Sequence, residues 1–589
     1  MPKTAAAGAG EASGCKLEFP TMDKVLHASI GRLTGGISPA ALSLAYTDWI
    51  HHLIASPDKQ LELAHAAAVN LMCFIGETAK ETVPLIGSDA LALPVNGDKR
   101  FKNEGWKRFP FNLFAAAHLL TERWWQKATT GLSGVSKHHE AVVSFIAQQM
   151  LDVVSPANFV ATNPELLEET FREGGMNLLR GALNFLEDTR RIQVGEKPVG
   201  VEKFQVGRNI AVTPGKVIAR DRLMELIQYA PATGMVHAEP LLIVPAWIMK
   251  YYILDLSPQN SLVRYLLDKG HTVFMVSWKN PDSEDRDLDF EDYYRLGVLA
   301  ALDAIEAIVP GRSIHAAGYC LGGTLLATAA AALARDGDTR LKTITLFAAQ
   351  TDFTEAGELM LFIDDAEVSF LEDSMSERGY LDARQMASAF QLLRSNDLIW
   401  SRLMHEYLMG EREPMFDLMA WNADTTRTPY RMHSTYLRRL CLNNELAEGH
   451  FTIGGRPVSL RDIRVPIFAV STLADHVAPW RSVYKIQALT DADVTFVLSN
   501  GGHNVGIVNP PGNPKRFHQI ATHKESENYI DPDSWQQSAI HHKGSWWSCW
   551  QSWLVRNSSE GRVPPPRTGD EEKGFPVLCD APGTYVLAQ

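Results

Sequence analysis

The strongest indication of chemistry in this sequence is the segment Gly318-Tyr319-Cys320-Leu321-Gly322-Gly323. The apolar run IHAA before it is typical of a strand, and the run TLLATAAAALA after it is typical of a helix. A nucleophile with a glycine two residues away on each side, at a strand–turn–helix junction, forms a nucleophile elbow. We therefore predict that Cys320 is a nucleophile at a helix N-terminus, with the Leu321 N–H as an oxyanion donor. The competing interpretation of a cysteine among glycines is a small core residue.

An acid and a base that would serve Cys320 follow later in the chain. Asp475 comes just after the strand-like run PIFAVST, and His503 lies in a glycine-flanked loop after the next such run, VTFVLSN. The order nucleophile, acid, base is the one found in folds with this elbow. We predict a triad with His503 as general base and Asp475 as its acid, and His476 as a further site residue. Taken singly, Asp475 could be a helix cap and His503 a loop histidine.

Short apolar runs alternate with helical patterns from about residue 200 onward. The runs are KVIARD, PLLIVPAW, TVFMVSW, IHAAGY, TITLFAA, PIFAVST and VTFVLSN. Continuous apolar strands that alternate with helices indicate an α/β fold with a mostly parallel sheet covered on both faces. Residues 352–460 interrupt this rhythm with helical patterns between two strands, as a cap insertion over an active site would.

The chain before residue 200 has a different texture. Residues 1–20 are predicted to be a disordered lead-in, and residues 21–200 a mainly helical N-terminal domain that packs or binds partners, because no hydrolytic motif occurs there. Its apolar periodicity breaks at Ser56-Pro57, where a second helix is predicted to begin. Residues 201–589 then form the predicted catalytic domain, which contains the insertion.

Composition limits the possible functions. The chain has 589 residues with 45% hydrophobic and 21% charged residues, which supports a large buried core and excludes a disordered protein. The formal charge of −13 makes nucleic-acid binding an unfavourable hypothesis. The six cysteines show no metal-site or disulfide spacing, so we expect reduced thiols and no metal.

Membrane insertion and export are also unfavourable hypotheses. Residues 314–334 carry no formal charge and are long enough to cross a bilayer, but their three glycines and the pattern change at Cys320 favour a buried strand, turn and helix. The N-terminus lacks the basic and apolar segments of a secretory signal. We therefore predict no transmembrane segment and a cytoplasmic location.

Several blocks of the sequence resemble the polyhydroxyalkanoate synthase (poly-3-hydroxybutyrate polymerase) family. They are SPANFVATNPE, FQVGRNIAVTPG, KYYILDLSP, GHTVFMVSWKNPD, GYCLGG, FDLMAWNAD, ADHVAPW, GGHNVGIVNPP and HHKGSWW. The resemblance runs from about residue 20 to near the C-terminus. Together with the complete helical N-terminal region, it suggests the single-subunit, class I-like type.

This resemblance implies an α/β-hydrolase fold and an acyltransferase activity. Such an enzyme takes an (R)-3-hydroxyacyl-coenzyme A, here 3-hydroxybutyryl-CoA, releases CoA and extends a polyester. Carried over, Cys320 holds the acyl chain as a thioester, His503 is the base, and Asp475 activates the substrate 3-hydroxyl directly or through His503. The CoA thioester is the substrate and no cofactor is implied. The family also implies a homodimer that works on the surface of polymer granules.

The sequence departs from a common family pattern at Pro245-Ala246-Trp247-Ile248-Met249-Lys250. Many members have Pro-Pro-x-Ile-Asn-Lys, so Ala246 and Met249 are substitutions. This loop follows the strand-like run LLIV, where the second oxyanion donor of such folds arises. The backbone N–H of Ile248 or Trp247 is predicted to serve, but substrate preference cannot be copied across.

Three assignments depend more loosely on the resemblance. Trp421 matches a position near the CoA channel, with a cap-core residue as the equal alternative. Lys515 and Arg516 could meet CoA phosphates, since Arg and Lys suit phosphate, or form a solvated basic pair.

Two rival functions stay open: a depolymerase or thioesterase with the same triad, and an inactive granule scaffold. The synthase blocks outside the triad argue against the first, and the complete triad against the second.

Overall fold

The computed structural model describes residues 20–82, 98–382, 385 and 399–589. The predicted lead-in therefore lies outside the described residues except for Pro20, the first residue of α1. Helices dominate the chain up to residue 200: α1 (Pro20–Thr34), α2 (Pro39–Ile54), α3 (Pro57–Thr82), α4 (Phe111–Thr129), α5 (Lys137–Val153), α6 (Pro164–Arg172) and α7 (Met176–Val194). The predicted break at Ser56-Pro57 is confirmed, because α3 starts on Pro57, whose missing N–H is tolerated in a first turn.

An extended sheet forms the centre of the remaining chain. Its strands are β1 (Gly215–Arg220), β2 (Met224–Tyr229), β4 (Leu241–Val244), β5 (Val273–Trp278), β6 (Ile314–Tyr319), β7 (Leu341–Phe347), β12 (Ile467–Thr472), β13 (Val494–Ser499), β14 (Phe517–His523), β15 (Ile540–Lys543) and β17 (Cys579–Asp580). Their order is β15-β14-β13-β12-β7-β6-β4-β5-β2-β1-β17. The strands from β13 to β5 pair in parallel, and antiparallel strands extend both edges. Each of the seven predicted runs overlaps one of these strands.

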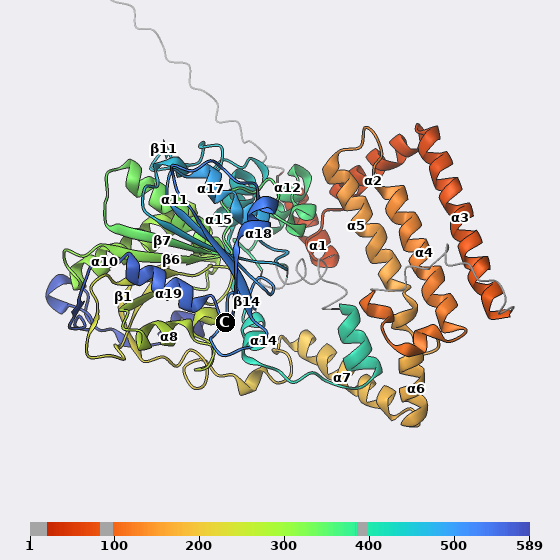
Figure 1. The fold of residues 1–589 in the computed structure, drawn as a ribbon, viewed down its shortest axis with the longest axis horizontal. Helices are drawn as coiled ribbons and strands as arrows, with labels where there is room; N and C mark the ends of the chain where they lie inside the picture. The colour runs from red at the N-terminus through yellow and green to blue at the C-terminus, as the bar shows by residue number, and fades with distance from the viewer. Residues whose placement is uncertain (1–19, 83–97, 383–384, 386–398) are drawn as a thin grey trace, which may run out of the picture.

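Helices cover both faces of this sheet, as the continuous apolar strands predict (Figure 1). The helices outside the insertion are α8 (Leu262–Asp268), α9 (Phe290–Asp292), α10 (Ala300–Ile308), α11 (Leu321–Arg335), α16 (Trp480–Tyr484), α17 (Ile486–Leu489), α18 (Pro532–Ser538) and α19 (Trp547–Arg556). One buried core joins the sheet to α10 and α11, and a second joins its other face to α8 and α19. In the second core Trp546 and Trp547 are at most 1% exposed, so both serve packing. Residues 314–334 form β6, the turn and α11, and no helix of the described residues could span a membrane.

The predicted insertion lies between β7 and β12. Its described elements are α12 (Asp365–Ser376), β8 (Tyr380–Leu381), η11 (Leu403–Leu408), α14 (Asp417–Asn422), β9 (Thr428–Pro429), α15 (Tyr430–Thr435), η12 (Tyr436–Leu442), β10 (Thr452–Ile453) and β11 (Arg456–Pro457). Part of one predicted helical segment, residues 390–398, falls outside the described residues. The helical character of the rest is confirmed.

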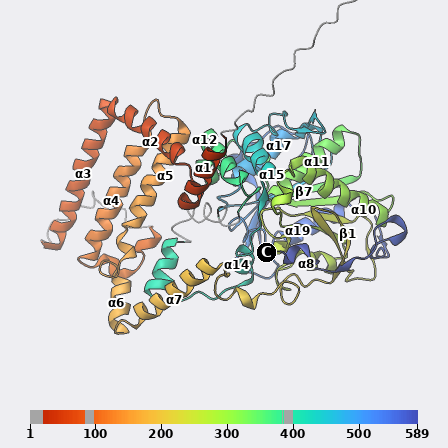
Figure 2. The same cartoon turned by 180° about the vertical axis from the view of Figure 1, so that it is seen from behind.

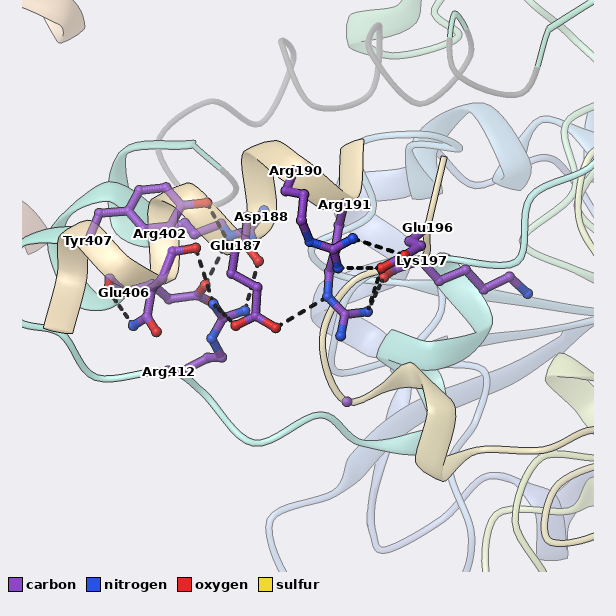
Figure 3. Close-up of polar contacts among 12 residues, drawn as sticks. Glu187, Asp188, Arg190, Arg191, Glu196, Lys197, Arg402, Glu406, Tyr407 and Arg412 are labelled. Carbon is purple, nitrogen blue, oxygen red and sulfur yellow. Dashed lines mark hydrogen bonds and ion pairs between the residues drawn. The ribbon is translucent and has the colours of Figure 1, made fainter. Parts of the chain in front are cut away.

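The insertion contacts the N-terminal helices in several places, and two of these contacts are the most extensive. At the first, α1 lies along α12, where His27 Nδ1 is 2.8 Å from Asp373 Oδ2; Figure 2 shows α1 between the helical bundle and α12. At the second, α7 packs on η11 so closely that a Cβ on Gly181 would clash with the Tyr407 carbonyl. There the Asp188 carboxylate accepts hydrogen bonds from Arg402 at 2.6 Å and Arg412 at 2.8 Å (Figure 3).

Candidate active site

Cys320 occupies the sharp turn between β6 and α11. Its backbone has φ 53° and ψ −125°, a strained conformation for a residue with a side chain, and its N–H donates to the Phe347 carbonyl at 2.8 Å. A Cβ on Gly318 would clash with the backbone of Gly323. The glycine spacing therefore has the predicted physical reason: strand and helix pass too closely here for any side chain.

Gly322 allows a second close approach, and its replacement should be costly. A Cβ there would clash with the backbone of Val244 and Pro245, the start of the loop that carries Ile248. We expect Gly322→Ala to lower the free energy of unfolding by about 1–3 kcal/mol and to slow CoA release about 10- to 100-fold through misplacement of this loop. Chemical denaturation and a CoA-release assay would measure both effects. Gly234→Ala, which meets no atom within 4 Å, is the matched control, and equal behaviour of the two variants would contradict this account.

The structure brings His503 and Asp475 together beside Cys320. His503 Nδ1 is 2.8 Å from Asp475 Oδ2, and the other carboxylate oxygen accepts the backbone N–H groups of Val477 and Ala478 at 2.9 and 2.8 Å. The Asp475 side chain is fully buried, and that of His503 is 11% exposed. Both residues follow the carboxyl ends of neighbouring parallel strands, β12 and β13, which explains why 28 positions of sequence separation become one contact.

The surroundings of His503 favour its protonated form. Burial alone would lower its pKa, but the charge of Asp475, its contact with the Cys320 thiol and the hydrogen bonds to both residues hold the pKa of His503 well above its usual range. An imidazolium beside a thiol favours the thiolate, the reactive form of a cysteine.

Tyr319 and Asn504 help to hold the His503 ring in place, and neither was predicted as a site residue. The Tyr319 ring lies 5.6 Å from the His503 ring, centroid to centroid, and the Tyr319 hydroxyl donates to Asn504 Oδ1 at 2.5 Å. Asn504 Nδ2 in turn donates to Asn422 at the end of α14, at 3.3 Å. Tyr319 directly precedes the nucleophile, so its position on β6 was the one available signal.

A cavity of about 290 Å³ opens on Cys320. Leu321 and Ile248 both line it. Leu321 is the first residue of α11, so its N–H has no acceptor within the helix and is free to meet an oxyanion. Ile248 lies in the loop after β4, where the second donor was predicted.

The walls of this cavity come from three parts of the chain. Just over half of the lining residues belong to the insertion, and most of these are apolar, such as Leu359, Met360, Ile363 and Leu437. The segment after α1, residues 34–37, contributes as well. The contribution of the insertion agrees with a cap, whereas that of the N-terminal segment was not predicted, because nothing in its sequence marks it as part of a site.

Glu367 of α12 holds the N-terminal segment against the cap. Its buried carboxyl lines the cavity and accepts the N–H of Ser38, the residue that caps α2, at 2.7 Å. Burial, assisted by the charge of Asp364, raises the pKa of Glu367 to about 8, although the Ser38 N–H opposes the shift. Asp364 itself lies 3.4 Å from His138 of α5.

This raised pKa predicts a pH-dependent stability. The folded protein binds the Glu367 proton more tightly than the unfolded chain, whose pKa is about 4.3, so the free energy of unfolding should fall between about pH 4.5 and 8, by about 1.4 kcal/mol for each unit of pKa difference, and then level off. Glu367→Gln, a mimic of the protonated form, should lose less stability between pH 6 and pH 9 than the wild type. Chemical denaturation of both proteins at both pH values gives this difference. Equal losses in the two proteins would assign the effect to other groups.

The remaining predicted site residues lie farther out. Trp421 is 2% exposed in the core, where its indole N–H donates to the Lys250 carbonyl at 2.7 Å, and it does not line the cavity. His476 is half-buried, and its carbonyl accepts the Glu358 N–H of the insertion at 3.4 Å. Arg516 is half-buried, with its guanidinium near Gly501 in the His503 loop, and burial lowers its pKa. Lys515 is exposed. Their roles stay predictions.

The loop that departs from the family pattern is well packed. Ala246 is 4% exposed, and Trp247 packs on the rings of Phe290 and Tyr293. Met249 forms a backbone bridge with Thr425 of the insertion. In the part of the chain that the structure describes, no cluster of three or more His, Cys, Asp and Glu side chains is arranged to hold a metal.

Comparison with known proteins agrees with this arrangement. The family model of the alpha/beta hydrolase fold matches residues 239–510, which span the sheet from β4 through the triad. The model of the poly-beta-hydroxybutyrate polymerase (PhaC) N-terminus matches residues 97–266, and that of the poly-beta-hydroxybutyrate polymerase N terminal matches residues 17–59.

Curated relatives extend this similarity over most of the chain. The poly(3-hydroxyalkanoate) polymerase of Methylorubrum extorquens is 43% identical over 504 residues, which cover 85% of this chain and 82% of the relative. The poly(3-hydroxyalkanoate) polymerase subunit PhaC of Rhizobium meliloti (strain 1021) is 39% identical, over 90% of this chain and 86% of its own. The corresponding subunit of Cupriavidus necator is 36% identical, over 84% and 83%.

The fold and the elbow define an α/β-hydrolase-fold enzyme with a cap insertion. The chain belongs to the poly-beta-hydroxybutyrate polymerase family. It is an acyltransferase that polymerises 3-hydroxyalkanoate units.

Proposed function

We propose that the enzyme polymerises (R)-3-hydroxyacyl-CoA, with 3-hydroxybutyryl-CoA as a substrate, through an acyl thioester on Cys320. The observation that carries this proposal is the contact of His503 with both Cys320 and the buried Asp475. Cys320 in turn lines a mostly apolar cavity. The Leu321 and Ile248 N–H groups would stabilise the oxyanion. CoA is the leaving group of the substrate, and no cofactor takes part in these steps.

Loading begins with the thiolate. His503 takes the Cys320 proton, the sulfur attacks the thioester carbonyl of the substrate, and the tetrahedral intermediate collapses with loss of the CoA thiolate. The imidazolium of His503 returns its proton to that thiolate. One thioester is broken and one is formed, so this step is close to thermoneutral.

Extension uses the hydroxyl of a second substrate molecule. Its 3-hydroxyl attacks the acyl thioester on Cys320, which forms an ester, and its proton passes through His503 to the departing Cys320 sulfur. Asp475 stabilises the imidazolium formed in this transfer. The lengthened chain, still a CoA thioester, then reacylates Cys320 with release of CoA.

One assay separates this proposal from its hydrolytic rival. Purified protein is incubated with 3-hydroxybutyryl-CoA, and free CoA and the mass of the acyl product are measured together. We expect CoA release with a high-mass polyester as the main product. Free 3-hydroxybutyrate as the main product would instead indicate a thioesterase or depolymerase with the same triad.

The surface supports further parts of the proposal. The α7 side chains Met176, Leu179, Leu183 and Leu186, spaced at three and four residues, are each more than half exposed. We propose that this face rests on the polymer granule in the cytoplasm, and that the enzyme is a homodimer. Reduced granule binding of a variant that combines Leu183→Ser with Leu186→Ser would support the placement of this face on the granule, and unchanged binding would contradict it.

For CoA, we propose that Arg516 contacts a phosphate group and that Trp421 and His476 border the path of the CoA molecule.

A further inference from the structure

One polar side chain of the cavity wall has no part in the triad and no polar partner among the residues that the structure describes. His433 of α15 is 5% exposed and lines the cavity that opens on Cys320. Within the described part of the chain, its ring makes no hydrogen bond or ion pair, and it packs against Tyr436, with 6.2 Å between the ring centroids. Burial lowers its pKa to about 4, so the ring is neutral at pH 7 and offers one N–H donor and one acceptor.

Three other polar side chains of the same wall have partners, whereas the buried Thr34 hydroxyl, like His433, has none among the described residues. The Thr324 hydroxyl donates to the Gln350 carbonyl at 2.7 Å, and the Gln350 amide donates to Ser482 at 3.1 Å. Glu367 accepts the Ser38 N–H. A buried polar group without a partner costs about 1–3 kcal/mol, and such a group in a cavity calls for an explanation.

The substrate supplies the missing partner. An acyl group on Cys320 must lie in this cavity, and a 3-hydroxyacyl group carries an oxygen on its third carbon, first as a hydroxyl and later as an ester oxygen. A charged residue would be costly in so apolar a wall, whereas a neutral imidazole hydrogen bonds uncharged oxygens without that cost. Of the wall residues near His433, Leu437 offers no polar group, and the Tyr436 hydroxyl is already hydrogen bonded to the Cys441 thiol.

We propose that His433 is a substrate-binding residue whose imidazole hydrogen bonds the oxygen at C3 of the acyl group held on Cys320. The inference rests on the proposed function, because it requires acylation of Cys320. It assigns the insertion a role in recognising 3-hydroxyacyl groups and in favouring the enantiomer whose hydroxyl faces α15.

The test compares 3-hydroxybutyryl-CoA with butyryl-CoA, which differs only by lacking the hydroxyl. The measurement is the rate of the first CoA release and of Cys320 acylation by mass spectrometry. We expect the wild type to acylate at least about tenfold faster with the hydroxylated substrate. His433→Phe should slow that reaction about 10- to 100-fold and change the butyryl reaction by less than about threefold, as loss of one buried hydrogen bond requires. His433→Gln or His433→Asn should restore part of the preference.

Leu437→Met is the control for a general disturbance of the wall, since Leu437 lines the cavity one helical turn later and should affect both substrates alike. Equal slowing of both substrates by His433→Phe would overturn the inference and leave a packing role. Should His433→Phe not fold, the amide variants and the wild-type preference still decide, because equal wild-type rates also overturn it. CoA release by the wild type from neither substrate would refute the proposed function itself.

Discussion

Cys320→Ala should abolish CoA release from 3-hydroxybutyryl-CoA, a loss of at least about 1,000-fold. The expected size follows from the role: without the sulfur there is no acyl intermediate, and the oxyanion donors that remain have no nucleophile to serve. The positive φ at Cys320 does not argue for unfolding of the variant, because alanine places the same Cβ in the same backbone conformation and lacks only the sulfur. Thiol titration of released CoA measures the rate, and mass spectrometry of the wild type should locate the acyl adduct on Cys320.

Cys441 provides a sharp control, because its thiol lines the same cavity. Burial raises the pKa of Cys441 to about 12, so it stays a protonated thiol at neutral pH. Cys441→Ala should therefore still be acylated on Cys320, as should Cys549→Ala, whose thiol lies away from the cavity near His518. An adduct on Cys441, or activity that survives in Cys320→Ala, would contradict the assignment.

Much of the sheet could be predicted because its central strands are buried on both faces. The strand β4 is a continuous apolar run and β13 a mostly apolar one, and every residue in them is buried. The edge strands carry no such signal: all four residues of β15 are exposed. In β2 the buried polar residues Glu225 and Gln228 obscure the pattern. Two of their partners, Thr584 and Gly569, lie more than 300 positions away, so no local pattern could reveal these contacts.

The proximity of Cys320, Asp475 and His503 could be predicted from their order in the chain and from their positions after strand ends. Parallel strands put their carboxyl ends at one edge of the sheet, so a nucleophile after β6, an acid after β12 and a base after β13 must converge there. The cavity wall follows no such rule. His433, Glu367 and the segment after α1 meet only through the docking of α12 and α1, and a buried histidine on a helix reads in sequence like any core residue.

The second large effect is expected at Asp475, and the structure makes the outcome depend on the replacement chosen. One carboxylate oxygen accepts the N–H groups of Val477 and Ala478, while the other faces His503. An asparagine would keep its carbonyl oxygen on the backbone N–H groups and turn its NH₂ toward His503 Nδ1. That nitrogen would then have to accept, which places the proton on Nε2, where it blocks transfer from Cys320.

Asp475→Asn should therefore slow both the first CoA release and extension. The expected slowing of extension is about 100- to 10,000-fold, the usual contribution of a positioned general base.

Asp475→Ala leaves His503 free to adopt either tautomer, and a thiol needs less help than a hydroxyl to lose its proton. That variant should still give a stoichiometric burst of CoA and an acylated Cys320, followed by very slow turnover, because the 3-hydroxyl must be activated without the carboxylate. Rapid-quench measurement of CoA and of the acylated enzyme separates the two phases. A burst in Asp475→Asn equal to that in Asp475→Ala would show that the tautomer of His503 is not what Asp475 controls, and the absence of a burst in both would show that the carboxylate is needed to activate the thiol itself.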